Sequence, residues 1–227
     1  MNGRVLVVCA SRGRRDRLDR MVASVLRTST KADIAVWEDE DDPQAEPRLS
    51  GDYNQVVGPR LGPCRSLNKL VAMFPDYEAY GAATDDCTFE TPGWDEWVLG
   101  QVKSFEGGVG AIAPHSDQSV PRMDFPWVTN RWVEAAGSFI PLGTYQAYWD
   151  VALQLVGEAT QIRFAKPDEF RIWHESMEVS DRAGMDSKEP RTFMFYLYHL
   201  YNDAQIVCVW LAHERKLLVD KLTEAAR

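Results

Sequence analysis

Charged side chains gather at three places in the chain, and each place directly follows a short apolar run. An arginine-rich turn occupies residues 11–14 (Ser-Arg-Gly-Arg), an acidic stretch occupies residues 38–42, and the pair Asp85-Asp86 follows a third apolar run. Arginine binds phosphate or base edges through several donors, whereas carboxylates hold a divalent cation or accept from base and ribose donors. Placed together, such groups are what a nucleotide-sugar and its metal would need.

Each cluster also has an ordinary structural interpretation. An acidic stretch is usually a solvated loop, and an arginine-rich first turn of a helix is usually solvated as well. The pair Asp85-Asp86 is harder to explain in this way, because two adjacent carboxylates after a buried strand repel each other. A counter-charge or a metal ion is therefore expected beside this pair.

Alternating strands and helices must position these clusters. Residues 4–10 and 34–37 are apolar runs typical of strands buried on both faces, and the segment between them has apolar residues at helical spacing. This pattern predicts a right-handed βαβ unit in an α/β fold with a mostly parallel central sheet. Further strands are expected at 80–84, 109–114, 161–165 and 170–173. Further helices are expected at 66–74, 94–99, 145–156 (with Gly157 as its stop) and beyond 190. A strand followed by a helix is expected at 127–137.

If the sheet is parallel, the carboxyl ends of its strands share one edge, and ligands bind beyond that edge. The three charged clusters all follow predicted strands, so they should lie together there. The sequence therefore predicts one site built from all three.

The composition excludes several function classes. The chain has 227 residues, of which 45% are hydrophobic and 26% charged, as in ordinary globular proteins rather than disordered or fibrous ones. Its 25 basic and 34 acidic residues give a net charge of −9, which disfavours a protein held to nucleic acid by bulk charge alone. A local basic groove remains allowed, because residues 1–31 contain eight basic and two acidic residues.

Cysteine usage and hydropathy give expectations about the compartment. The four cysteines are widely spaced without a CxxC pair, and Cys9 and Cys208 lie in apolar runs where reduced, buried thiols are expected. Neither a signal peptide nor an apolar run long enough to span a bilayer is visible. A soluble, cytoplasmic protein without membrane contact is therefore expected.

The order of the motifs resembles that of GT-A-fold glycosyltransferases related to family 2, of the small bacterial and bacteriophage type. The strongest segment is residues 84–95 (Thr-Asp-Asp-Cys-Thr-Phe-Glu-Thr-Pro-Gly-Trp-Asp), whose paired aspartates would be the counterpart of the family's DxD motif. Similarity continues through 127–137, 148–150 and 172–174. The resemblance implies a GT-A (Rossmann-like) domain over residues 1–187 and a helical C-terminal extension over 188–227, packed on that domain or at an oligomer interface.

The resemblance also implies roles for individual residues. Asp150 would be the general base, and Asp86 and His174 would bind Mn²⁺ or Mg²⁺. The nucleotide-sugar donor would be bound by Ser11, Arg12, Arg14, Glu38, Asp39, Arg65, Asn68 and Asp85. Cys87 departs from the family, which often has Asp or His at that position, and a thiolate suits softer metals, so Cys87 is not expected to be a ligand.

Some of these residues have alternatives. Taken alone, His174 is a partly buried histidine with a backbone partner, and Asp150 is a solvent-facing acid on an amphipathic helix. Apolar neighbours would raise the pKa of Asp150 and make it a better base. Five tryptophans could either stack on an acceptor or pack in the core: Trp94, Trp97, Trp127, Trp132 and Trp149.

The resemblance implies an enzyme of hexosyltransferase type, which moves a sugar from a nucleotide-sugar such as a UDP-sugar to an acceptor hydroxyl with inversion. The acceptor would be a hydroxymethylated DNA base, a virion protein or a small molecule. One alternative is a nucleotidyltransferase, which should have a glycine-rich loop where this chain has only Gly13. Another is a non-catalytic nucleotide-sugar-binding module, and the aromatic run at 193–201 is compatible with a homo-oligomer.

Overall fold

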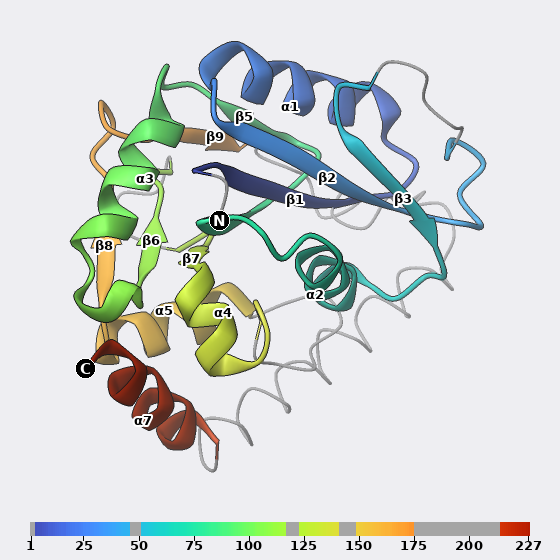
Figure 1. Cartoon of the computed structure of the whole chain (residues 1–227). Helices are drawn as coiled ribbons and strands as arrows, with labels where there is room; N and C mark the ends of the chain where they lie inside the picture. Colours follow the sequence, from blue (N-terminus) through green and yellow to red (C-terminus); the bar gives the residue numbers. More distant parts are fainter. Residues whose placement is uncertain (1–2, 46–50, 117–122, 141–148, 175–213) are drawn as a thin grey trace.

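The computed structural model describes residues 3–45, 51–116, 123–140, 149–174 and 214–227. Within them a seven-stranded sheet runs in the order β3-β2-β1-β4-β7-β6-β8 (Figure 1). Pairing is parallel from β3 to β4 and between β6 and β8, whereas β7 is antiparallel to both of its neighbours. The predicted α/β fold with a mostly parallel central sheet is therefore confirmed. The strands are β1 (Val5–Ser11), β2 (Ala32–Asp39), β3 (Asn54–Gly58), β4 (Ala79–Ala83), β6 (Ala111–Ala113), β7 (Trp127–Thr129) and β8 (Ile162–Phe164).

Helices bury both faces of this sheet. Alternate side chains of β1 point to opposite faces, so Leu6 and Val8 join one core cluster while Val5 and Val7 join the other. The first cluster is completed by α2 (Pro63–Met73), α4 (Asn130–Ala136), α5 (Trp149–Ala159) and α7 (Arg215–Ala226). The second is completed by α1 (Arg15–Thr28) and α3 (Trp94–Ser104). This two-sided burial explains why the central strands are continuous apolar runs.

A small second sheet lies beside α1. It consists of β5 (Cys87–Phe89) and β9 (Ile172–His174), which pair antiparallel with Cys87 opposite His174. The backbone N–H of Phe89 donates to Ser24 Oγ of α1 at 3.0 Å, which fixes the ribbon against that helix. The sequence predicted β9 but not β5.

Other sequence-based expectations need correction. The helix expected to stop at Gly157 continues to Ala159. Gly157 instead allows close packing, since a Cβ there would lie 3.2 Å from Ile162 and 3.4 Å from Ala111. The helix expected at 94–99 extends to Ser104, and the edge strand β3 was not predicted. Of the helical tail, the structure describes α7, and the remaining stretch with the aromatic run at 193–201 lies outside the described residues.

Tryptophans that could have faced an acceptor are mostly part of the core. Trp94, Trp127 and Trp132 are completely buried, and Trp97 packs against the second cluster while partly buried. Trp94 stacks on Phe170 with ring centroids 4.9 Å apart. Core packing is therefore the role of these side chains, and the side chain of Trp149 lies outside the described part of the chain.

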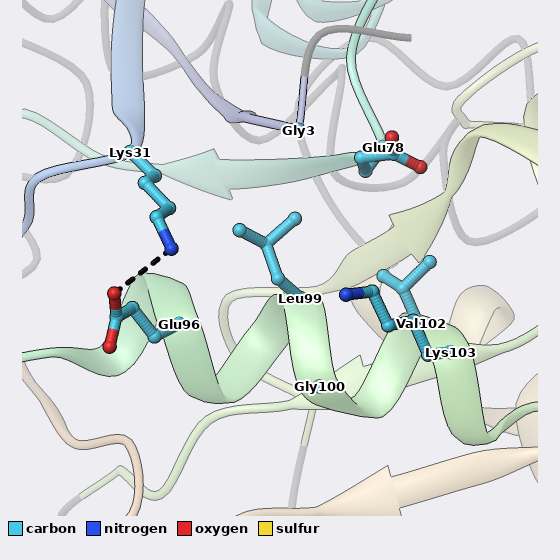
Figure 2. Close-up of a pocket in the computed structure, with 8 residues that line it drawn as sticks. All are labelled: Gly3, Lys31, Glu78, Glu96, Leu99, Gly100, Val102 and Lys103. Atoms are coloured by element: carbon cyan, nitrogen blue, oxygen red, sulfur yellow. Dashed lines mark ion pairs between the residues drawn. The ribbon is translucent and has the colours of Figure 1, made fainter.

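A cavity of about 480 Å³ opens beside α3 (Figure 2). Gly3, Lys31 and Glu78, which line it, each precede a parallel strand, so the cavity lies at the amino-terminal edge of the sheet. Lys31 forms an ion pair with Glu96 of α3 at 3.0 Å. This cavity is thus at the opposite edge from the charged clusters.

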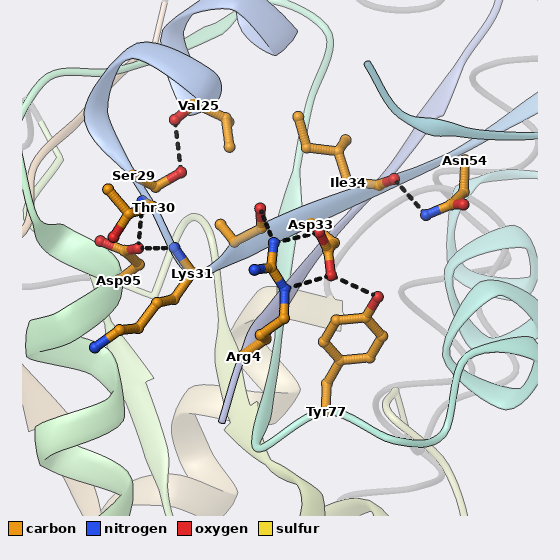
Figure 3. A network of polar contacts seen from close by, with 11 residues as sticks. Arg4, Val25, Ser29, Thr30, Lys31, Asp33, Ile34, Asn54, Tyr77 and Asp95 are labelled. Atoms are coloured by element: carbon orange, nitrogen blue, oxygen red, sulfur yellow. Dashed lines mark hydrogen bonds and ion pairs between the residues drawn. The ribbon is translucent and has the colours of Figure 1, made fainter. Parts of the chain in front are cut away.

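Polar contacts at the same amino-terminal edge tie α3 to the beginning of β2 (Figure 3). The completely buried Asp95 accepts the backbone N–H groups of Thr30 and Lys31 at 2.7 and 2.6 Å. Trp94 Nε1 donates to Thr28 Oγ1 at 3.0 Å. The Trp-Asp end of segment 84–95 therefore has a structural role at this edge of the sheet.

Candidate functional site

The three charged clusters meet at one edge of the sheet, as predicted. Ser11, the last residue of β1, is in register with Glu38 of β2, and Cys9 of β1 is in register with Ala83 of β4. The polar residues that follow each strand therefore begin at the same level. The parallel pairing of three adjacent strands is what brings residues 71 to 74 positions apart into direct contact.

The aspartate pair is almost fully buried, with 5% of Asp85 and 4% of Asp86 exposed. Ser11 Oγ donates to Asp85 Oδ2 at 2.9 Å, and Arg14 donates to Asp85 Oδ1 at 3.0 Å. The same Arg14 nitrogen lies 3.5 Å from Asp86 Oδ2. The expected counter-charge is thus supplied by the arginine-rich turn itself.

The β5–β9 ribbon brings His174 to the other side of Asp86. His174 Nε2 lies 3.2 Å from Asp86 Oδ1, which is buried and accepts no well-aligned hydrogen bond. Phe125 packs its ring edge-on against the imidazole, with centroids 5.4 Å apart. A residue 88 positions beyond Asp86 in the chain is therefore its neighbour in space.

This arrangement fits two ligands of one divalent cation. Neighbouring ligands around an octahedral ion with bonds of about 2.1 Å are about 3.0 Å apart, close to the observed 3.2 Å between the two donor atoms. A carboxylate and an imidazole are suitable donors for Mn²⁺. Within the described part of the chain, no group of three or more His, Cys, Asp and Glu side chains is arranged to hold a metal ion. Further ligands would have to come from phosphate oxygens or water.

Burial and charge act differently on the two aspartates. Burial raises the pKa of Asp85 above its usual value, although Arg14 and Ser11 oppose this effect. Burial would also raise the pKa of Asp86, but the proximity of His174 and the charge of Arg14 outweigh it, so the pKa lies below its usual value. Asp86, which faces His174, therefore stays ionised to a lower pH than Asp85.

The acidic stretch is not a solvated loop at its beginning. Glu38 is only 3% exposed and accepts from Arg15 at 2.8 Å and from Gln55 of β3. Asp42 is also buried and accepts the backbone N–H of Gly13 at 2.6 Å. The arginine-rich turn and the acidic stretch thus hold each other in place.

Arg12 and Asp39 form the outer part of the same contact. Arg12 bonds to both carboxylate oxygens of the exposed Asp41 and lies 3.4 Å from Asp39 Oδ2. Arg60 Nε approaches the same Asp39 oxygen at 3.9 Å. Burial raises the pKa of Asp39, with the two arginines opposing. Arg12 and Asp39, which were both expected to bind the donor, therefore lie at the carboxyl edge of the sheet.

The structure does not join the remaining expected residues to this cluster. Asn68 makes reciprocal hydrogen bonds with the backbone of Ile140, at 2.9 and 2.7 Å, and so holds Ile140 against α2. Arg65 is an exposed residue in the first turn of α2. Asp150 lies half-buried in the first turn of α5, and the contacts that link the aspartate pair to Arg14 and His174 do not include it.

Two residues that contribute to the charged site were not identified from the sequence, and the structure also defines the state of Cys87. Asp42 belonged to the recognised acidic stretch and Arg15 directly follows the arginine-rich turn, but the sequence did not show that these two side chains turn inward. Cys9 and Cys87 are buried free thiols, and burial raises both pKa values, so both side chains remain neutral. Buried Cys9 is as predicted, while Cys208 lies outside the described residues.

No helix among the described residues is long and apolar enough to cross a bilayer. No protein-family model matches the chain, and a search of curated proteins finds no match.

The fold is similar to two crystal structures of S. aureus TarS, a family-2-like glycosyltransferase. For residues 1–349 of TarS the TM-score is 0.54 at 9% identity, covering 75% of this chain and 60% of that one. For the second structure the TM-score is 0.57 at 9% identity, covering 98% of this chain and 42% of that one. This chain thus spans about half the length of the proteins it resembles, and the likeness establishes a GT-A-like fold.

Proposed function

We propose that this protein is a glycosyltransferase that moves a sugar from a nucleotide-sugar, specifically a UDP-sugar, to an acceptor hydroxyl with inversion. One observation carries the proposal: in a GT-A-like fold, the buried Asp85-Asp86 pair meets Arg14 and His174 at the carboxyl edge of the parallel strands. Ligands of open α/β sheets bind at this edge. The TarS likeness supports the same class of reaction.

Asp86 and His174 would hold Mn²⁺ or Mg²⁺, since their donor atoms are 3.2 Å apart. When bound, such an ion offsets the negative charge that develops on the leaving diphosphate. Asp85, fixed by Ser11 and Arg14, would accept from the ribose hydroxyl groups. Arg12, Glu38 and Asp39 would recognise the base, and Arg65 would add positive charge near the diphosphate.

Asp150 would act as the general base. As the acceptor oxygen attacks the anomeric carbon, the bond from that carbon to the diphosphate oxygen breaks, and the acceptor proton passes to the Asp150 carboxylate. The assignment is supported by the sequence resemblance and by the place of Asp150 in the first turn of α5, where the residue is half-buried.

The acceptor classes are those that the sequence resemblance implies: a hydroxymethylated DNA base, a virion protein or a small molecule. The net charge of −9 makes DNA the least favoured of the three. The extension over 188–227 would pack on the catalytic domain or mediate a homo-oligomer.

A panel of nucleotide-sugars, each with and without Mn²⁺, tests the proposal. Thermal shift identifies the donor and the metal together, because a ligand that binds the folded state raises the melting temperature. Release of nucleoside diphosphate from that donor is the expected activity, and it should stop in excess EDTA. Release of pyrophosphate would instead indicate a nucleotidyltransferase, and binding without turnover of any acceptor would indicate a binding module.

The base assignment has its own test. Asp150→Asn should abolish transfer while leaving donor binding intact. Glu158→Gln is the matched control, since it makes the same charge change at an exposed position of α5. Unimpaired transfer by Asp150→Asn would overturn the assignment.

A further inference from the structure

Arg14 lies on one side of the Asp85-Asp86 pair, where its positive charge faces two adjacent carboxylates. Its Nη1 lies 3.0 Å from Asp85 Oδ1 and 3.5 Å from Asp86 Oδ2. The three side chains are 16%, 6% and 3% exposed, so water screens their charges only weakly. Arg14 therefore serves as an internal counter-cation for both carboxylates.

The neighbouring arginines are engaged elsewhere. Arg12 contacts Asp41 and Asp39, and Arg15 contacts Glu38 at 2.8 Å. Among the described residues, the ion pairs of Asp85 and Asp86 are made with Arg14 and His174. Arg12, Arg14 and Arg15 thus each pair with different carboxylates.

We propose that Arg14 competes with the divalent cation for the aspartate pair, and thereby makes metal binding depend on the presence of the nucleotide. This inference rests on the proposed metal site at Asp86 and His174. With the ion bound, three positive charges would face two carboxylates, an excess of one in a buried site. The diphosphate of a nucleotide supplies the missing negative charge, so ion and nucleotide bind best together. Buried Asp86 Oδ1, which accepts no well-aligned hydrogen bond, remains available as the ligand atom.

Removing the competing charge should strengthen binding of the metal alone. Coulomb repulsion between a divalent ion and a guanidinium about 5 Å away corresponds to a factor of about ten even at the dielectric constant of water. Arg14→Gln should therefore bind Mn²⁺ at least about tenfold more tightly than the wild type in calorimetric titrations without nucleotide. Arg15→Gln is the matched control, because it removes the same charge one residue away, and its affinity should change by less than about threefold.

Two further measurements keep the test decisive. UDP should raise the Mn²⁺ affinity of the wild type more than that of Arg14→Gln. Adding Asp86→Asn to the Arg14→Gln variant should abolish the gained affinity, which would locate the ion at this pair. If Arg14→Gln does not fold, Arg14→Met replaces it, with a side chain of similar apolar length.

The outcomes separate the two proposals. Equal Mn²⁺ affinity in Arg14→Gln and wild type, or an equal gain in Arg15→Gln, would overturn the role of Arg14 while leaving the metal site intact. Absence of Mn²⁺ binding in every variant, even with UDP, would overturn both the metal site and this inference.

Discussion

Replacing Asp95 tests whether the Trp-Asp end of segment 84–95 acts in stability rather than in chemistry. The Asp95 carboxylate is completely buried, and one of its oxygens accepts two backbone N–H groups of the turn before β2, at 2.7 and 2.6 Å (Figure 3). Both contacts lie at the amino-terminal edge of the sheet, opposite the aspartate pair. Asp95→Ala should therefore lower stability and leave donor binding unchanged.

The size of the effect follows from the contacts. A hydrogen bond to a charged group contributes about 1.5–3 kcal/mol, and the two bonds share one oxygen, so we expect a loss of about 3 kcal/mol rather than the full sum. In a protein of this size, that loss corresponds to a fall in melting temperature of about 6–12 °C. Asp95→Asn, which keeps an acceptor oxygen, should fall between Asp95→Ala and the wild type.

Thermal unfolding followed by circular dichroism measures this loss. Glu96→Ala is the matched control, because Glu96 is the next residue of α3 and its ion pair with Lys31 is exposed. Such surface pairs contribute about 0–1 kcal/mol. A melting temperature of Asp95→Ala equal to that of the control would refute the reasoning. Loss of donor binding at unchanged stability would instead place Asp95 in the functional site.

Three further predictions have defined outcomes. Asp86→Asn should lower metal-dependent release of nucleoside diphosphate by about 100-fold. The thermal shift caused by the donor in the absence of metal should be retained. Activity within a factor of three of the wild type would contradict the role of Asp86 as a metal ligand. Burial and a hydrogen bond raise the pKa of Tyr77 from 10.0 to about 12. The folded state thus keeps a proton that the unfolded state loses near pH 10, so this stabilisation is complete below pH 10 and declines as the pH rises to 12. Burial raises the pKa of Tyr80 as well. Ultraviolet titration of the wild type should therefore show a late-ionising tyrosine phase, and an undiminished amplitude of that phase in Tyr77→Phe would contradict this prediction. Gly81→Ala should prevent folding, since a Cβ there would overlap the Trp127 ring. Gly100→Ala on α3, where a Cβ meets nothing within 4 Å, should instead raise the free energy of unfolding in urea by about 0.5–1 kcal/mol. Equal stability of the two variants would contradict this packing.

The central strands and the meeting of the charged clusters were predictable from the sequence. β1, β2 and β4 are buried on both faces, so each is a continuous apolar run that ends in polar residues. Once the strands are parallel, the edge where those residues meet is determined. The aspartate pair needed a counter-charge for the same electrostatic reason, and Arg14 supplies it.

The rest could not be predicted because its signals are weak or non-local. β3 is a half-exposed edge strand without an apolar run, and β5 has three residues stabilised by pairing with β9. Gly157 is typical of a helix stop, yet here it allows close contact between α5 and β6. The partners within the charged runs depend on how neighbouring loops fit together, which spacing along the chain does not encode.

The pairing of β5 with β9 also has a consequence for folding. Cys87 and His174 are 87 positions apart, so this ribbon can form only after a very long loop has closed. Contacts of such high sequence separation form slowly compared with the local βαβ unit around β1 and β2. We therefore expect His174 to reach Asp86 after the βαβ unit has formed, so that a partly folded chain presents the acidic pair without its histidine. The site is completed only in a chain whose distant segments have already assembled.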